Sequence, residues 1–466
     1  MKRPNVLLVQ TDQQRWDAVG ANGNRDIKTP VLDQLAAEGV NFDHCFVQSP
    51  VCMPSRVSLL TGRYPSALRI THMGVPVPTD TVTLPRMLRN YGYRCGIVGK
   101  LHFLPHANRD HREIHPSYGF DHLEISDEPG CYPDAYRAWV RRKAPEHLDR
   151  ISVGLPPKAV AWREVMGIDD GIEHPPERFP IEAIPFPAPS HLTHAAFVAD
   201  QTQEFIRANR DRAWLAVASF YSPHSPWVAP REYLDMYQAE TLSLPKFPAD
   251  LNVQRDERRF GDDELRTARR GYYAMVSEVD AHLGTILRTI DECGLTDNTI
   301  VIFVSDHGEW LGEHLRYGKG YPADDAISRV PLILRWPGGI NPPGPAISSI
   351  VEAVDVVPTV LDACGIQPPP QLQGCSLMPF VNGQVTRAHT SAITEATGWK
   401  ALRTERYRYL FHSDGSESLF DLRTDAGEYV DVVKDQAYAA DLAQLRHLLL
   451  QRMLAAEQPL PRVWPY

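Results

Sequence analysis

The sequence predicts an α/β fold, in which helices flank a large, mixed but mostly parallel sheet and a smaller α+β subdomain follows at the C-terminus. The chain has 466 residues, which is too many for one ordinary hydrophobic core. Short, continuous apolar runs alternate with helical patterns as far as about residue 370, which is typical of a buried parallel sheet. Because this alternation weakens further on, we expect one large domain over residues 1–370 and a smaller one over residues 371–466.

Strands and helices of the large domain follow from its apolar patterns. The runs that predict strands are 6–9, 40–46, 95–99, 214–221, 299–304 and 330–335. Helical spacing lies between them, over 29–39, 83–92, 195–209 and 262–290. Pro30 near the start of the first helix and Gly39 after its end are typical helix boundaries. The acidic residues 262–264 favour the start of the longest helix, whose apolar stripe we interpret as core packing.

Two regions depart from this alternation. Residues 103–190 show no sustained period and are rich in proline, so we expect a loop-rich insertion there that shapes a substrate pocket. In the second domain, residues 400–403 and 407–411 predict short antiparallel strands, and 442–453 predict a terminal helix.

Composition and charge restrict the partners. Hydrophobic residues make up 43% and charged residues 23%, the balance of a soluble globular protein. The net charge of −10 argues against a nucleic acid or a membrane surface as partner, so an anionic substrate would need local cations or a metal. The seven cysteines are an odd number without a C-x-x-C pair, which favours neither a disulfide framework nor a zinc ribbon.

The N-terminal segment indicates a cytoplasmic protein. It has no apolar core or small-residue cleavage site of a signal peptide, and no run in the chain is long enough to cross a bilayer. A periplasmic or secreted location stays open if a leader was removed.

Polar side chains follow four of the predicted strands. Asp12 and Gln13 follow the first, Lys100 and His102 the run 95–99, His224 the run 214–221, and Asp306 with His307 the run 299–304. Ligands of open α/β sheets collect beyond the carboxyl ends of strands, so we expect these side chains to share one site. For Asp12 alone, a turn or helix-cap role is as good an interpretation.

A cysteine before a short helical pattern adds to this set. In the stretch Cys52-Met53-Pro54-Ser55-Arg56, Pro54 suits a first helical turn, so Cys52 would face the positive end of a helix with Arg56 close by. The alternative is a buried structural cysteine. Carboxylates with amide or imidazole ligands favour Ca²⁺, Mg²⁺ or Mn²⁺ over zinc. A thiol is a poor partner for such a hard cation, which indicates that Cys52 does not stay a cysteine.

The ordered motifs resemble those of type I sulfatases of the alkaline-phosphatase-like superfamily. Residues 52–63 match the signature C-x-P-S-R-x-x-x-L-T-G-R, in which the cysteine is oxidised to Cα-formylglycine. The similarity continues through Gly99-Lys100-Leu101-His102, the Pro-His-x-Pro element at His224, Ser305-Asp306-His307-Gly308 and Gly318-Lys319-Gly320, and so covers about residues 4–360. It implies a sulfatase fold, hydrolysis of a sulfate monoester, one divalent metal ion (Ca²⁺ first, Mg²⁺ or Mn²⁺ as alternatives) and maturation by a formylglycine-generating enzyme.

The resemblance also implies roles for single residues. Asp12, Gln13, Asp306, His307 and modified Cys52 would hold the metal, and Arg56 would stabilise formylglycine. The residues implied to bind the sulfate oxygens are Lys100, His102, His224 and Lys319, with His224 or Lys319 as the acid that protonates the leaving alcohol. His72, near the Cys52 turn, is a further candidate substrate contact.

Gln13 departs from the pattern of many sulfatases, which have an aspartate there. A glutamine oxygen can still bind the metal, but the site loses one negative charge. Relatives with glutamine at this place and histidine after the later aspartate include phosphonate monoester hydrolases, so a phosphonate or phosphodiester hydrolase is one alternative. An unmatured protein that binds anions without turnover is another. The identity of the sulfate ester, aryl, saccharide or choline-type, and assembly into homo-oligomers stay open.

Overall fold

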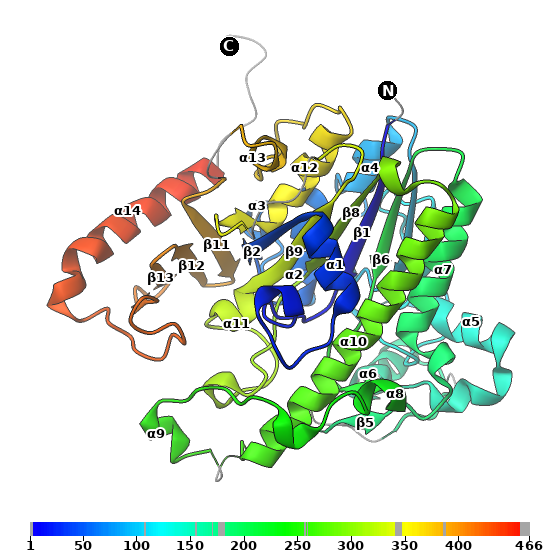
Figure 1. Cartoon of the computed structure of the whole chain (residues 1–466), viewed down its shortest axis with the longest axis horizontal. Coiled ribbons are helices and arrows are strands. Elements are labelled where there is room, and N and C mark those ends of the chain that lie inside the picture. Colours follow the sequence, from blue (N-terminus) through cyan, green and yellow to red (C-terminus); the bar gives the residue numbers. More distant parts are fainter. Residues whose placement is uncertain are drawn as a thin grey trace.

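A computed structural model describes residues 3–106, 109–153, 156–169, 171–175, 182–255, 258, 260–340, 347–384 and 388–456, except for the side chains of 156–158. Its main element is an eight-stranded sheet in the order β10-β2-β9-β8-β1-β6-β3-β4 (Figure 1). The strands are β1 (Asn5–Thr11), β2 (Val40–Phe46), β3 (Arg94–Gly99), β4 (His122–Ile125), β6 (Trp214–Ser219), β8 (Thr299–Ser305), β9 (Arg329–Arg335) and β10 (Val351–Glu352). Only β9 runs antiparallel to its neighbours in this sheet, which confirms the predicted mixed, mostly parallel sheet.

Helices cover both faces of this sheet because its central strands are apolar on both sides. In β1, Val6 and Leu8 join one buried cluster, and Leu7 and Val9 join the other. The first cluster packs against α2 (Cys52–Thr61), α4 (Leu84–Arg89), α12 (Val356–Ala363) and α13 (Met378–Val381). The second packs against α1 (Pro30–Glu38), α5 (Ala135–Lys143), α7 (His194–Asn209) and α10 (Asp262–Glu292). Figure 1 shows α7 and α10 side by side on this second face.

The predicted helices form where the sequence indicates them. The longest, α10, begins at Asp262, and the Glu264 side chain accepts a hydrogen bond from the Gly261 N–H at 2.9 Å. The helix α2 begins at Cys52 itself, after the extended residue Val51, and ends at Thr61, before Gly62, whose φ of 66° suits glycine.

Residues 103–190 contain more regular structure than the sequence indicates. Besides β4 and α5, they include α6 (Pro156–Met166) and β5 (Ile184–Pro185), which pairs with β7 (Val228–Ala229). Residues 107–108, 154–155, 170 and 176–181 of this stretch lie outside the described residues. The Asp134 side chain accepts the Arg137 N–H and caps α5, whose few apolar residues are buried. The helix ends in three basic residues, 141–143, which interrupt the apolar pattern. For this reason the sequence does not show a helical stripe there.

The C-terminal part has the predicted α+β character. Four antiparallel strands, in the order β11-β12-β13-β14, pack against α14 (Ala439–Ala456). Their bounds are β11 (Ser391–Ala396), β12 (Trp399–Thr404), β13 (Tyr407–His412) and β14 (Glu417–Asp421). The domain boundary at residue 370 stays a prediction.

Short elements complete the described chain. They are α3 (Pro65–Leu68), α8 (Arg231–Leu234), α9 (Ala249–Asn252), α11 (Asp325–Ser328) and the 3₁₀ turns η1 (Gly20–Asn22), η3 (Pro145–Arg150), η4 (Ser190–Leu192), η5 (Ala239–Thr241), η6 (Thr296–Asn298), η7 (Glu313–Leu315), η8 (Ala353–Asp355) and η9 (Gln436–Tyr438). Among the described residues, no helix is both long and apolar enough to span a membrane.

Candidate active site

Four neighbouring strands bring the predicted residues to one edge of the sheet. The strands β8, β1, β6 and β3 are adjacent and parallel, so their carboxyl ends align. Asp306 and His307 follow β8, Asp12 and Gln13 follow β1, His224 lies in the loop after β6, and Lys100 and His102 follow β3. With the exception of Lys319 in the later loop, these side chains are buried. Polar groups gathered at one buried edge make this edge the candidate site.

The Cys52 sulfur lies among these groups. Its Sγ is 2.7 Å from Lys319 Nζ, 3.3 Å from His307 Nε2 and 3.7 Å from Asp12 Oδ1. Burial raises the pKa of the Cys52 thiol, but Lys319, Lys100 and His307 outweigh burial and hold this pKa well below its usual value. The structure therefore places Cys52 at the start of α2, in a cationic setting.

Arg56, one turn further along α2, joins the four strand ends. Its Nε donates to Asp306 Oδ2 at 2.7 Å and its Nη2 to Asp12 Oδ2 at 3.1 Å. Its Nη1 donates to the Lys100 carbonyl at 2.8 Å and to Ser219 Oγ at 2.9 Å. The guanidinium is fully engaged with the protein, so it orients the carboxylates.

The two carboxylates form a pocket that fits a cation. Ligand atoms of Asp12, Cys52, Asp306 and His307 all lie within 4.8 Å of one another. Burial and the adjacent Asp12 charge raise the pKa of Asp306; burial lowers the pKa of His307, but Asp306 reverses this and raises it. Two neighbouring groups thus tend to hold a proton where a divalent cation would lie. Oxygen-rich ligation of this kind suits Ca²⁺, Mg²⁺ or Mn²⁺.

Gln13 supplies a further oxygen. Its backbone N–H donates to Asp306 Oδ1 at 3.0 Å, and its side-chain Nε2 donates to Glu309 Oε2. This bond turns the amide so that Oε1 is buried and without a hydrogen-bond partner among the residues that the structure describes. A buried acceptor left unpaired is costly in a protein interior, and a bound cation would satisfy it.

Lysines and further imidazoles also lie near the Cys52 sulfur. Lys100 Nζ is 2.8 Å from Asp12 Oδ2 and lies over the Tyr221 ring, 4.9 Å from its centroid. Burial raises the pKa of Asp12, but Lys100, Lys319 and His224 outweigh it and lower this pKa. Burial, together with nearby lysines, lowers the pKa values of His102 and His224. The site is therefore buried and rich in cationic and imidazole side chains.

Two positioning residues were missed in the sequence. Glu309 Oε1 accepts the Leu311 N–H at 3.1 Å and the Gly318 N–H, so Glu309 fixes the loop that carries Lys319 and also holds Gln13. Asp127, just beyond the edge strand β4, accepts the N–H groups of Leu101 and His102, each at 2.9 Å. His102 has a φ of 55°, and these bonds hold that turn. Glu309 had a signal, because it lies three residues after Asp306; Asp127 is an acid in an aperiodic stretch and had none.

His72 lies apart from the buried residues. It is exposed, and its Nδ1 is 3.1 Å from Thr397 Oγ1 in the C-terminal part of the chain. Its link to the site is indirect, since Met73 Sδ accepts the Met53 N–H at 3.5 Å, one residue after Cys52. The predicted substrate contact of His72 stays a prediction.

Comparisons with known proteins agree with this geometry. A family model described as sulfatase matches residues 4–366, and one described as the C-terminal part of N-sulphoglucosamine sulphohydrolase matches residues 312–455. An arylsulfatase of Clostridium perfringens is 28% identical and covers 98% of this chain and 95% of its own length. A choline-sulfatase of Rhizobium meliloti is also 28% identical, over 95% of this chain and 85% of its own.

The fold is also similar to that of a solved structure. The phosphonate monoester hydrolase of Agrobacterium radiobacter superposes with a TM-score of 0.80 at 25% identity, over 97% of this chain and 96% of its own. Since the sulfatase model spans most of the chain and includes all four strand ends, this protein belongs to the sulfatase family of the alkaline-phosphatase-like superfamily.

Proposed function

We propose that this sulfatase-family hydrolase cleaves a sulfate monoester to an alcohol and inorganic sulfate, with Cα-formylglycine made from Cys52 at its centre. The observation that carries the proposal is the setting of the Cys52 sulfur, which lies between a buried carboxylate pair and the cations Lys100 and Lys319. A thiolate is a poor ligand for a hard cation beside two carboxylates. Formylglycine, as its hydrated aldehyde, would supply an oxygen nucleophile in place of the sulfur, and a second hydroxyl for release of sulfate.

The metal would be held by Asp12, Gln13, Asp306, His307 and the residue at position 52. We propose Ca²⁺ first, with Mg²⁺ or Mn²⁺ as alternatives, because oxygen donors dominate the set. Bound there, the ion would supply Lewis-acid chemistry and offset the repulsion between Asp12 and Asp306. Arg56 would act as a positioning residue that keeps both carboxylates in place, through its bonds at 2.7 and 3.1 Å.

The remaining residues would bind and protonate the substrate. Lys100, His102, His224 and Lys319 lie around the Cys52 sulfur and would bind the sulfate oxygens. His224 Nδ1 is 2.6 Å from the Ser225 carbonyl, which leaves Nε2 to face the substrate. Lys319 is partly exposed and its Nζ is 2.7 Å from the sulfur, so it could reach an oxygen bound at position 52. One of these two residues would donate the proton to the leaving oxygen.

Phosphonate monoester hydrolysis is the second candidate. The observations that favour it are Gln13 in place of an acid and the similarity to two phosphonate monoester hydrolases, with TM-scores of 0.80 and 0.79. A sulfate monoester and a phosphonate monoester each carry one negative charge, so the charge of the site favours neither. They differ in the carbon substituent on phosphorus, which needs additional room.

Maturation of Cys52 is the first prediction. Trypsin releases residues 29–56, which contain Cys45 as well as Cys52, so Cys45 is an internal control. After coexpression with a formylglycine-generating enzyme, we expect this peptide to take up one alkylating group instead of two. Cys52→Ser, which lacks the second hydroxyl, should lose turnover by about 10³-fold or more, whereas the matched variant Cys293→Ser should keep it. Two alkylated thiols with full activity would contradict the proposal; two thiols without activity would favour the anion-binding alternative.

Metal removal is the second prediction. Dialysis against a calcium chelator should abolish activity, and Ca²⁺ should restore it, because Asp12 and Asp306 repel each other without a cation. Asp306→Asn should lower both the bound calcium and kcat/KM. The control is Asp280→Asn, another buried carboxylate, which accepts the N–H groups of Val31 and Leu32 far from the site. Elemental analysis gives the metal content; full activity in metal-free protein would refute the assignment.

Substrate preference is the third prediction. We expect kcat/KM on an aryl sulfate to exceed that on an aryl phosphonate monoester with the same leaving group by at least about tenfold, or about 1.4 kcal/mol of transition-state stabilisation. Because both substrates have the same leaving group, the ratio of their kcat/KM values depends only on the sulfate or phosphonate group that is attacked. A preference for the phosphonate would replace the first proposal with the second candidate. The same assay on saccharide and choline sulfates then identifies the ester.

The proton donor is the fourth prediction. Removing the donor should slow an alkyl sulfate, a poor leaving group, by about 10²–10⁴-fold and an activated aryl sulfate much less. Lys319→Ala and His224→Ala are compared on both substrates. The acid is the residue whose variant loses much more activity on the alkyl sulfate than on the aryl sulfate. If both variants lose equal activity on the two substrates, neither residue is the acid.

A further inference from the structure

A second group of metal-binding side chains lies outside the candidate active site. It consists of Asp355 at the end of η8, Cys375 in the loop after α12, and His389 just before β11. His389 Nε2 is 2.8 Å from Asp355 Oδ2 and 3.4 Å from Cys375 Sγ, and all three ligand atoms lie within 4.8 Å of one another. We call these three residues the Asp355 cluster.

Both contacts converge on one ring nitrogen. A single N–H on Nε2 can point at the carboxylate or at the sulfur, but not well at both. A metal ion between the three groups would contact all three ligand atoms at once.

The distances are near those of a zinc site. With Zn–S near 2.3 Å and Zn–N and Zn–O near 2.0–2.2 Å, tetrahedral ligation requires about 3.6 Å between sulfur and nitrogen and about 3.4 Å between nitrogen and oxygen. The corresponding distances here are 3.4 and 2.8 Å, so a modest widening would suffice. A set of sulfur, nitrogen and oxygen donors favours Zn²⁺ over Ca²⁺, in contrast to the oxygen-rich set around Asp12.

The carboxylate is held in place by its neighbours. Asp355 Oδ1 accepts the Cys375 N–H at 2.8 Å, and Oδ2 accepts the Glu352 N–H at 2.8 Å. Hydrogen bonds of this kind orient metal ligands and reduce the cost of assembling a site. The bond from Cys375 also fixes the backbone of the residue that supplies the sulfur.

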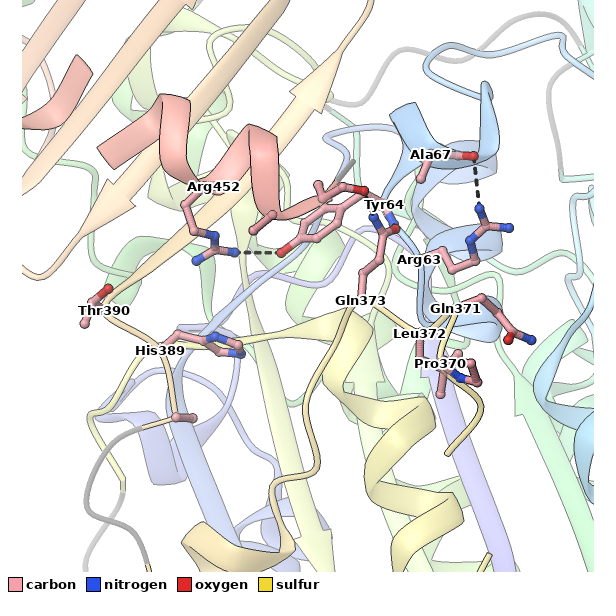
Figure 2. A pocket seen from close by; sticks show the side chains of 13 residues that line it. Arg63, Tyr64, Ala67, Pro370, Gln371, Leu372, Gln373, His389, Thr390 and Arg452 are labelled. Atoms are coloured by element: carbon pink, nitrogen blue, oxygen red, sulfur yellow. Dashed lines mark hydrogen bonds between the residues drawn. The ribbon is translucent and has the colours of Figure 1, made fainter. Parts of the chain in front are cut away.

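A large cavity gives access from solvent. It has a volume of about 970 Å³, and His389 lines it together with Tyr64, Gln373 and Arg452. Figure 2 shows His389 and Arg452 on one side of this space, with the Tyr64 ring between them and Gln373. A three-ligand zinc site needs one position for water or a ligand, and this cavity would provide it.

We propose that Asp355, Cys375 and His389 bind a Zn²⁺ ion whose fourth position opens into the cavity beside Tyr64 and Arg452. The ion would tie the start of α12 to the segment that enters the C-terminal sheet, and so would stabilise the contact between the two sheets. The proposal does not depend on the reaction at Cys52.

Zinc binding to the full chain tests this inference. The protein is freed of metal with a chelator, saturated with Ca²⁺, loaded with ZnCl₂ and passed through a desalting column. Elemental analysis should give one zinc per chain in the wild type and in Asp306→Asn, and much less in Cys375→Ser and His389→Gln. Cys293→Ser is the matched control and should keep its zinc. Asp355 is left unchanged because its side chain also caps backbone N–H groups.

Two further measurements separate ligation from folding. Co²⁺ in place of zinc should give a sulfur-to-metal charge-transfer band in the wild type that Cys375→Ser lacks. Thermal unfolding should show intact folding of both variants and a zinc-dependent rise in Tm in the wild type alone. Equal zinc content in wild type, Cys375→Ser and His389→Gln would overturn the proposal, as would a wild type that retains no zinc.

Discussion

The buried guanidinium of Arg56 is the interaction on which the candidate site depends. It contacts residues that follow four different strands: Asp306 after β8, Asp12 after β1, Ser219 at the end of β6 and Lys100 after β3. Removing a guanidinium from water costs several kcal/mol, which only nearly complete pairing offsets. The buried Arg56 therefore stays in place only if the four strands keep their register. Since Arg56 lies one turn after Cys52 in α2, the same pairing holds the helix that carries the sulfur.

This arrangement would let a chain of net charge −10 hold the anionic substrate that we propose. The field of the whole protein repels a sulfate ester, so attraction must come from nearby groups. Asp12 pairs with Arg56 and Lys100, while Asp306 pairs with Arg56. Lys319 lies farther from Asp12, at 3.9 Å from its Oδ1, and 2.7 Å from the sulfur. In a buried site these few charges act at short range with little screening. The balance of charges within the site therefore matters more for binding than the net charge of the protein.

The strand ends could be predicted from the sequence because continuous apolar runs and the residues that follow them are local signals. Asp12, Lys100, His224 and Asp306 are then expected at the same edge of the sheet, because the parallel strands before them run in a common direction. The contents of residues 103–190 could not be predicted in this way. There, His111 stacks on Tyr132 at 3.7 Å between ring centroids, and His106 lies over His102 at 4.2 Å. Such contacts join residues without periodic spacing, and Asp127 holds the turn at His102 through backbone N–H groups.

Gln13 and Glu309 show how one substitution can be tied to the rest of the site. Gln13 Nε2 donates to Glu309, a buried acid whose pKa is raised by burial. An aspartate at position 13, as in many sulfatases, would place two carboxylates against each other there and could not donate this bond. Glu309 also accepts the Gly318 N–H, next to Lys319. The charge at position 13 and the placement of Lys319 are therefore linked through a single buried carboxylate, so exchanging Gln13 alone would disturb the metal side and the anion side of the site together.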